Sequence, residues 1–186
     1  MDRASEAAGE LALTSHVPAN RRRYVVMGVA GVGKSLIGSR LASALGVAFA
    51  DGDDFHSAEN VAKMAAGIPL TDTDRAGWLA ALAAVLADTR RAHDGLVLAC
   101  SALKRMYRDI LRHGAPDLQL IFLTAPEPLV AARLETRTDH YMPPSLLASQ
   151  LATLEPPTAD ESPWICDTSE SPDAIVARLV ALARTA

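Results

Sequence analysis

The sequence feature that most constrains the fold is the run Gly-Val-Ala-Gly-Val-Gly-Lys-Ser at residues 28–35. Two glycines separated by four residues and followed by Lys and Ser form the P-loop pattern, which binds phosphate between a strand and a helix. The apolar run 24–27 before it suits a strand buried on both faces, and the proline-free run 36–45 after it suits a helix. Because pattern and setting agree, we expect a phosphate site here, and not a glycine-rich turn that holds no ligand.

In such a loop, the glycines let backbone N–H groups turn towards phosphate oxygens, and the helix adds the positive end of its dipole. Lys34 is expected to neutralise the β- and γ-phosphates of ATP during transfer, and Ser35 is expected to offer its hydroxyl group to Mg²⁺. The expected nucleotide contacts along this segment are Gly28, Gly31, Val32, Gly33, Lys34, Ser35 and Leu36.

Composition narrows the classes of protein that remain. With 186 residues, 49% of them apolar, the chain suits one domain with a substantial core. A net charge of −4 argues against binding to nucleic acid or to a membrane surface, and no apolar run approaches the ~20 residues of a membrane span. Cys100 and Cys166 lie in apolar runs and are expected as reduced, buried thiols of a cytoplasmic protein, although the sequence leaves a disulfide open.

Short apolar runs that alternate with helical patterns indicate an α/β domain, in which a five-stranded parallel sheet lies between helices. The expected strands are 24–27, 47–50, 96–100, 118–123 and 164–166. Thr71 and Asp74 form a capping-box pattern at the start of a helix that runs to about residue 93. We assign the domain to residues 21–186, and residues 1–20, rich in Ala, Ser and Glu, to a flexible tail.

Acidic residues follow the second expected strand. Asp51 and Asp53 lie at the carboxyl end of this strand, and ligands of open parallel sheets bind at that edge. One carboxylate of such a pair could support Mg²⁺, and the other could face the hydroxyl group of an acceptor. The alternative is a solvated acidic turn that caps the next helix. Two cations, Lys104 and Arg108, follow the third strand; either alone would be an ordinary surface charge, but this position makes both of them candidates for the site.

Several longer motifs resemble the gluconokinase family. Beside the P-loop they are Asp-Gly-Asp-Asp-Phe-His at 51–56, the run 63–75 followed by Trp78, and the segments 100–109 and 149–156. The likeness spans about residues 24–182. It implies phosphoryl transfer from ATP to the 6-hydroxyl group of D-gluconate, a P-loop kinase fold like that of shikimate and nucleoside-monophosphate kinases, and usually a homodimer.

The resemblance also assigns the residues of an acceptor pocket, within a helical substrate region at about 54–93 and beyond it. It matches Asp51 to the carboxylate beside Mg²⁺. The residues that match the acceptor pocket are Asp53, His56, Lys63, Arg75, Lys104, Arg108 and His140. A guanidinium fork such as that of Arg75 suits the carboxylate of a sugar acid, and the hydroxyl groups need donors and acceptors such as His56 and Asp53. His56 could instead only cap the helix that follows.

A lid is expected at about 133–145. Arg133 and Arg137 stand four residues apart on one helical face, from which both could reach ATP, and Arg133 is a candidate for stabilising the transferred charge. As an alternative, the two arginines form a solvated helix face. Related sequences carry Lys-Gly-His after the second arginine, whereas this chain has Thr138-Asp139-His140, so its lid lacks a cation and a flexible residue.

Two other functions fit part of the sequence. A kinase for another small hydroxy acid, such as shikimate, shares the P-loop and the paired aspartates, but the stretch from His56 to Trp78 favours gluconate. A nucleotide-dependent switch also needs a P-loop. The chain has no Asn-Lys-x-Asp motif for guanine, and its paired carboxylates and cations suit a small acceptor better.

Overall fold

The computed structural model describes residues 18–136 and 146–185. Most of the expected tail (1–17) and the lid segment 137–145, with Arg137 and His140, therefore lie outside the described residues. The described chain begins with a short 3-10 helix, η1 (Ala19–Arg21), directly before the first strand.

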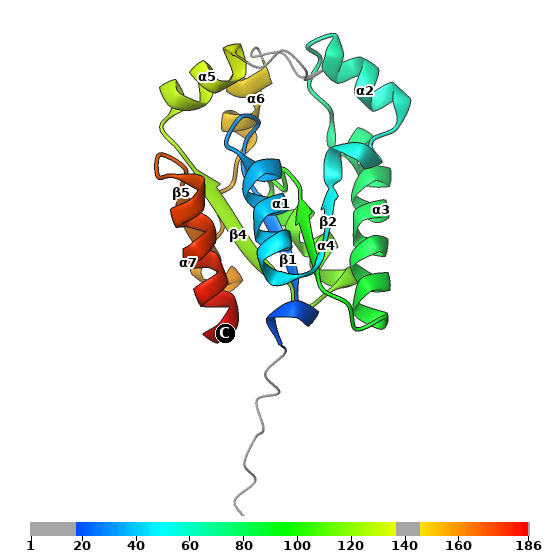
Figure 1. Cartoon of the computed structure of the whole chain (residues 1–186). Coiled ribbons are helices and arrows are strands. Elements are labelled where there is room, and N and C mark those ends of the chain that lie inside the picture. The colour runs from blue at the N-terminus through cyan, green and yellow to red at the C-terminus, as the bar shows by residue number, and fades with distance from the viewer. Residues whose placement is uncertain (1–17, 137–145, 186) are drawn as a thin grey trace, which may run out of the picture.

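The strands form one parallel sheet in the order β2-β3-β1-β4-β5 (Figure 1). They are β1 (Arg23–Met27), β2 (Ala48–Asp51), β3 (Leu96–Ala99), β4 (Gln119–Thr124) and β5 (Trp164–Asp167). The expected five-stranded parallel sheet is confirmed, and each strand begins and ends within one residue of the expected run.

Helices connect the strands. They are α1 (Lys34–Leu45), η2 (Gly52–Phe55), α2 (Ala58–Ala65), α3 (Asp72–Arg91), α4 (Arg105–Gly114), α5 (Glu127–Glu135), α6 (Leu146–Thr153), η3 (Ala159–Glu161) and α7 (Pro172–Thr185). The capping box at the start of α3 is confirmed, because Thr71 accepts a hydrogen bond from the Asp74 backbone N–H and the Asp74 carboxylate accepts one from the Thr71 N–H. Local side-chain chemistry thus fixes where this helix begins.

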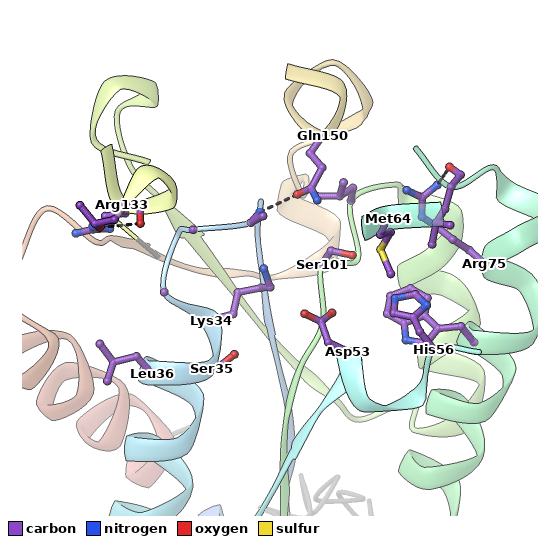
Figure 2. A pocket seen from close by; sticks show the side chains of 17 residues that line it. Lys34, Ser35, Leu36, Asp53, His56, Met64, Arg75, Ser101, Arg133 and Gln150 are labelled. Carbon is purple, nitrogen blue, oxygen red and sulfur yellow. Dashed lines mark hydrogen bonds between the residues drawn. The ribbon is translucent and has the colours of Figure 1, made fainter. Parts of the chain in front are cut away.

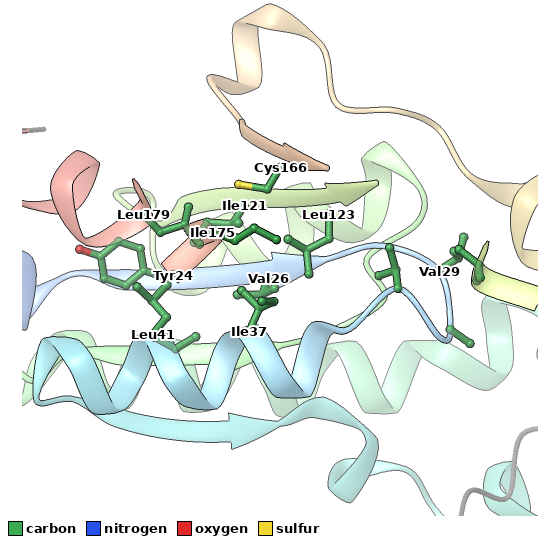
Figure 3. Close-up of a cluster of buried hydrophobic side chains, with 14 of the residues drawn as sticks. Tyr24, Val26, Val29, Ile37, Leu41, Ile121, Leu123, Cys166, Ile175 and Leu179 are labelled. Atoms are coloured by element: carbon green, nitrogen blue, oxygen red, sulfur yellow. The ribbon is translucent and has the colours of Figure 1, made fainter. Parts of the chain in front are cut away.

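The sheet divides the core into two layers. On one face, α1 and α7 pack against strand residues such as Tyr24 and Val26 (Figure 3). On the other face, α3 and α4 pack against Val25 and Met27. All of β1 is buried, as expected for a central strand that is covered on both sides. The carboxyl ends of the strands point to the upper edge of the sheet in Figure 1, where α2, α5 and α6 lie above them.

The two cysteines are free and buried, as expected. Cys100 belongs to the core layer beneath α3 and α4, whereas Cys166 belongs to the layer beneath α1 and α7, so the sheet separates the two thiols. Burial raises the pKa of Cys100 to about 12, which keeps it protonated. No helix in the two described ranges combines the length and the apolarity that a membrane crossing needs.

A buried ion pair ties α4 to the segment before β5. The Arg108 guanidinium donates to both carboxylate oxygens of Glu161, at 2.6 and 2.8 Å, and both side chains are almost fully buried. Arg108 also donates to the backbone carbonyls of Ala102, Leu103 and Glu155. One side chain therefore stabilises the loop after β3 and the segment after α6 together.

We predict that Glu161→Gln lowers the free energy of unfolding by about 3–5 kcal/mol, because Arg108 then stays buried without a counter-charge. Urea denaturation followed by circular dichroism measures the change. Asp160→Asn is the matched control, because Asp160 pairs with Arg105 at the surface and its loss should change stability little. Equal stability of Glu161→Gln and the wild type would contradict the structural role of the pair.

Candidate active site

A cavity of about 310 Å³ opens at the carboxyl edge of the sheet. It is lined by the P-loop, the turn after β2, the helices α2 and α3, the loop after β3, and the helices α5 and α6. Figure 2 shows Lys34, Asp53 and Arg75 among the side chains that line it. The nucleotide loop, an acidic side chain and a guanidinium group therefore line one open cavity of the size typical for a small ligand.

The P-loop has the backbone that anion binding requires. Gly31 and Gly33 take φ angles of +78° and +103°, which side chains rarely adopt, and the space beside Gly33 is open. Lys34 Nζ lies 3.0 Å from the Val29 carbonyl oxygen, to which it donates. Lys34, Ser35, Leu36, Gly31 and Gly33 all line the cavity.

Two of the expected nucleotide contacts, Gly28 and Val32, do not line the cavity. The Gly28 N–H donates to the Ser101 carbonyl at 3.3 Å, and a Cβ atom on Gly28 would lie 2.7 Å from the Leu123 carbonyl oxygen. The Val32 side chain is buried in the core layer beneath α1. Both residues therefore shape the loop, and neither of them lines the cavity in which phosphate would lie.

The expected metal ligands lie together. The Ser35 hydroxyl donates to the Asp51 carboxylate at 2.5 Å, and Asp51 also accepts from the Asp53 backbone N–H at 3.1 Å. A hydroxyl and a carboxylate oxygen at this separation fit the oxygen chemistry that Mg²⁺ prefers. The described residues contain no cluster of three or more His, Cys, Asp or Glu side chains able to hold a metal ion. Mg²⁺ is commonly bound by one or two protein oxygens together with waters and substrate phosphates. Asp53, unlike Asp51, lines the cavity itself.

His56 and Trp78 form the floor of the opposite half of the cavity. Their rings stack with centroids 4.4 Å apart and planes 12° apart. The Trp78 indole N–H donates to the Gly52 carbonyl at 2.6 Å, so the same ring also holds the turn between Asp51 and Asp53. Burial lowers the pKa of His56 below its ordinary value, partly opposed by Asp53 and reinforced by Arg75. Near neutral pH the imidazole is therefore neutral, and it can both donate and accept hydrogen bonds.

Arg75 reaches the cavity from the first turn of α3. Its guanidinium donates to the Leu70 carbonyl, approaches the Tyr107 hydroxyl at 3.5 Å, and lies 5.7 Å from the centre of the Tyr107 ring. These contacts hold the guanidinium in position. Among the described contacts of Arg75, none is with a carboxylate. The expected position of Arg75 in the pocket is supported by this geometry.

Three other expected substrate contacts are not brought to the cavity. Lys63 pairs with Asp74 at 2.6 Å, and this bond, with those from Thr71, lowers the pKa of Asp74 to about 2. Lys104 donates to both carboxylate oxygens of Asp72 at 2.8 Å. Arg108 is buried against Glu161, as described above. Each cation has a carboxylate partner on another element of the fold, and the first two of these ion pairs stabilise the start of α3.

Arg133 lines the cavity at its other end. Its guanidinium donates to the hydroxyl and the carbonyl of Thr168, at 2.9 and 2.7 Å, so it joins α5 to the turn after β5 (Figure 2). Arg137 and His140, the other lid residues predicted to bind ligand, lie outside the described residues.

Some lining residues were not assigned from the sequence. They are Ala30, Met64, Leu70, Trp78, Ser101, Leu103, Thr136 and Gln150. Several of them belong to the motifs that carry the family resemblance, and that membership was the available signal. Their side chains are apolar or neutral, however, so charge and titration gave no reason to select them.

Comparisons with known proteins agree with this geometry. The family model described as shikimate kinase matches residues 30–183. The chain is 44% identical over 159 residues to the gluconokinase of Gluconobacter oxydans (strain 621H), covering 86% of this chain and 89% of that protein. It is also 44% identical over 138 residues to the thermosensitive gluconokinase of Escherichia coli (strain K12), covering 74% of each. The crystal structure of a gluconokinase from Sinorhizobium meliloti 1021 matches with a TM-score of 0.78 at 44% identity, covering 89% of this chain and 95% of that one.

The lowered pKa of His56 predicts a pH dependence of stability. Between its pKa in the folded protein and the ordinary value of 6.5, the unfolded chain binds more protons, so acidification from pH 7.5 to 5.5 should destabilise the fold. His56→Gln should remove this part of the loss. Urea denaturation at both pH values measures it, with His113→Gln, at an exposed position on α4, as the control. Equal pH slopes for the wild type and His56→Gln would contradict the prediction.

Proposed function

This chain belongs to the gluconokinase family, and from that premise we propose that its cavity transfers the γ-phosphoryl group of ATP to the 6-hydroxyl group of D-gluconate. The products are 6-phospho-D-gluconate and ADP. The protein is thus an enzyme, a phosphotransferase with an alcohol group as acceptor, on an α/β P-loop kinase fold.

The observation that carries the proposal is that a single cavity is lined by Lys34, Asp53 and Arg75. Phosphoryl transfer consists largely of holding donor and acceptor in line and of neutralising the charge on the transferred group. A cation at the donor and a carboxylate facing the acceptor meet these two needs. A guanidinium on the acceptor side meets a third, which is to bind a carboxylate.

At the donor end, the N–H groups of the P-loop bind phosphate oxygens, and Lys34 places its ammonium against the β- and γ-phosphates. Ser35 and Asp51 would hold Mg²⁺, which neutralises phosphate charge when bound. Arg133 approaches from α5 at the nucleotide end, where its two bonds to Thr168 leave further N–H donors of the guanidinium for a phosphate.

At the acceptor end, Arg75 binds the carboxylate of gluconate, and the neutral ring of His56 binds hydroxyl groups along the sugar chain. Asp53 accepts a hydrogen bond from the 6-hydroxyl group and aims its oxygen at the γ-phosphorus atom, taking up the proton as transfer proceeds. The stack on Trp78 holds His56 at a fixed distance from Asp53.

The alternative acceptor is shikimate, since the family model that matches residues 30–183 is described as shikimate kinase. Relatives that are 44% identical over most of their length are gluconokinases, which favours gluconate. The homodimer that the family resemblance implies and the cytoplasmic location expected from the two cysteines stay predictions, and light scattering on the purified protein tests the first.

A coupled assay of ATP consumption tests the proposed function. We expect turnover with D-gluconate and Mg²⁺, and background rates with shikimate or without an acceptor. Lys34→Ala should reduce turnover by about 100-fold or more, because the transferred charge loses its cation, and this variant also controls for a contaminating kinase. Turnover with shikimate alone would favour the alternative acceptor, and tight GTP binding without any sugar-acid kinase activity would favour a switch.

Asp53→Asn should lower kcat by about 100-fold while the Kd of ATP changes little, because the amide cannot take up the proton of the hydroxyl group. Steady-state kinetics and calorimetric titration with a non-hydrolysable ATP analogue measure the two effects. Asp54→Asn, at an exposed position next in sequence, is the matched control. If only the KM for gluconate rises, Asp53 binds the acceptor without acting in catalysis.

A further inference from the structure

A residue that follows the lid is hydrogen-bonded to the nucleotide loop. Gln150, on α6, accepts a hydrogen bond through its Oε1 atom from the backbone N–H of Ala30, at 2.7 Å. Ala30 is the third residue of the P-loop and is almost fully buried. The contact joins segments that lie 120 residues apart in the sequence.

This bond settles which way the carboxamide of Gln150 faces. A backbone N–H can only donate, so the oxygen of the carboxamide must face Ala30 and the Nε2 amino group must face the other way. Figure 2 shows this arrangement, with the nitrogen of Gln150 on the side of Met64 and Arg75. Gln150 also lines a second, smaller cavity beside the first, to which Arg75 and Met64 contribute. Its two polar atoms therefore point to different halves of the site.

The helix that carries Gln150 is held at both ends. Leu146, at its start, packs against Met64 and Leu70 in a small apolar cluster beside the acceptor half. Directly after its end, the Glu155 backbone N–H donates to the Leu103 carbonyl at 2.9 Å, and the Glu155 carboxylate accepts from the Arg105 N–H at 2.6 Å. Gln150 thus extends from a fixed support, so its two hydrogen-bonding atoms are kept at defined positions.

We propose that Gln150 determines acceptor specificity: Oε1 holds the Ala30 peptide of the nucleotide loop, and Nε2 donates to an oxygen atom of the bound sugar acid. This inference rests on the proposed function and assigns a contact within that site. A neutral N–H donor between the phosphates and Arg75 suits a hydroxyl or carboxylate oxygen, whereas a negatively charged atom there would repel both substrates. The same side chain fixes the distance between the P-loop and the acceptor.

Two substitutions separate the two contacts. Gln150→Glu keeps an oxygen for the Ala30 N–H but replaces the amino group with a charged oxygen. Gln150→Met keeps the length of the side chain and removes both polar atoms. Gln119→Met is the matched control. Gln119 lies on β4, where its Nε2 atom donates to the carbonyl oxygens of Leu120 and Ser162, and it does not line the cavity.

We expect Gln150→Met to raise the KM for gluconate about tenfold, the effect of losing one hydrogen bond to a polar ligand. Gln150→Glu should raise it further and should lower kcat. The Kd of ADP, measured by calorimetry, should stay within about twofold in Gln150→Glu, which keeps an oxygen for the Ala30 N–H, and Gln119→Met should match the wild type in every constant. Thermal unfolding followed by circular dichroism verifies that each variant is folded.

An unchanged KM for gluconate in both Gln150 variants would overturn the inference while leaving the proposed function intact. A parallel rise in the KM for gluconate and the Kd of ADP in Gln150→Glu would also overturn it, because Gln150 would then only shape the nucleotide loop. A wild-type protein that binds ADP but phosphorylates no sugar acid would overturn the proposed function and this inference together. If Gln150→Met does not fold, the comparison of Gln150→Glu with the wild type decides.

Discussion

The geometry of the site depends on one close approach between backbones. A Cβ atom on Gly52 would lie 2.6 Å from the Ala99 carbonyl oxygen in β3, so the turn after β2 can pack this closely only with glycine. The carbonyl of the same residue accepts the indole hydrogen bond from Trp78. Because Asp51 and Asp53 flank Gly52, this packing fixes one carboxylate beside Ser35 and the other in the cavity. Donor and acceptor chemistry therefore derive their spacing from the contact of β2 with β3.

Ion pairs outside the cavity stabilise the acceptor half of the site. Two carboxylates in the first turn of α3, Asp72 and Asp74, bind Lys104 and Lys63 respectively, and Tyr107 donates a further hydrogen bond to Asp72. Arg75 directly follows Asp74 in sequence, one turn from the cap of the helix. The ion pairs hold that turn against α2 and α4, and the guanidinium that we propose for the sugar-acid carboxylate is thereby positioned by residues that do not line the cavity.

Features set by local sequence were predicted well. Each of these features depends on residues within a few positions of one another. They are the P-loop with its flanking strand and helix, the capping box at Thr71, and the strands of the sheet. Contacts between distant segments were not accessible in this way. Spacing placed Arg108 on a helix after the third strand, but it could not show that Glu161, 53 residues later, would bury it. Gln150 carries no charge, so nothing in its chemistry indicated a bond to Ala30. Residue type and position on a helix identify candidates, and the partner across the fold decides their role.

The placement of the two thiols determines whether the folded protein can form an internal disulfide. Cys100 and Cys166 lie on opposite faces of the sheet, so no bridge between them can form while the strands stay paired. The native fold consequently neither gains a crosslink under oxidising conditions nor loses one under reducing conditions. Each thiol becomes reactive only when the helices that cover its face of the sheet separate from the strands. Its reactivity therefore reports local opening of that core layer.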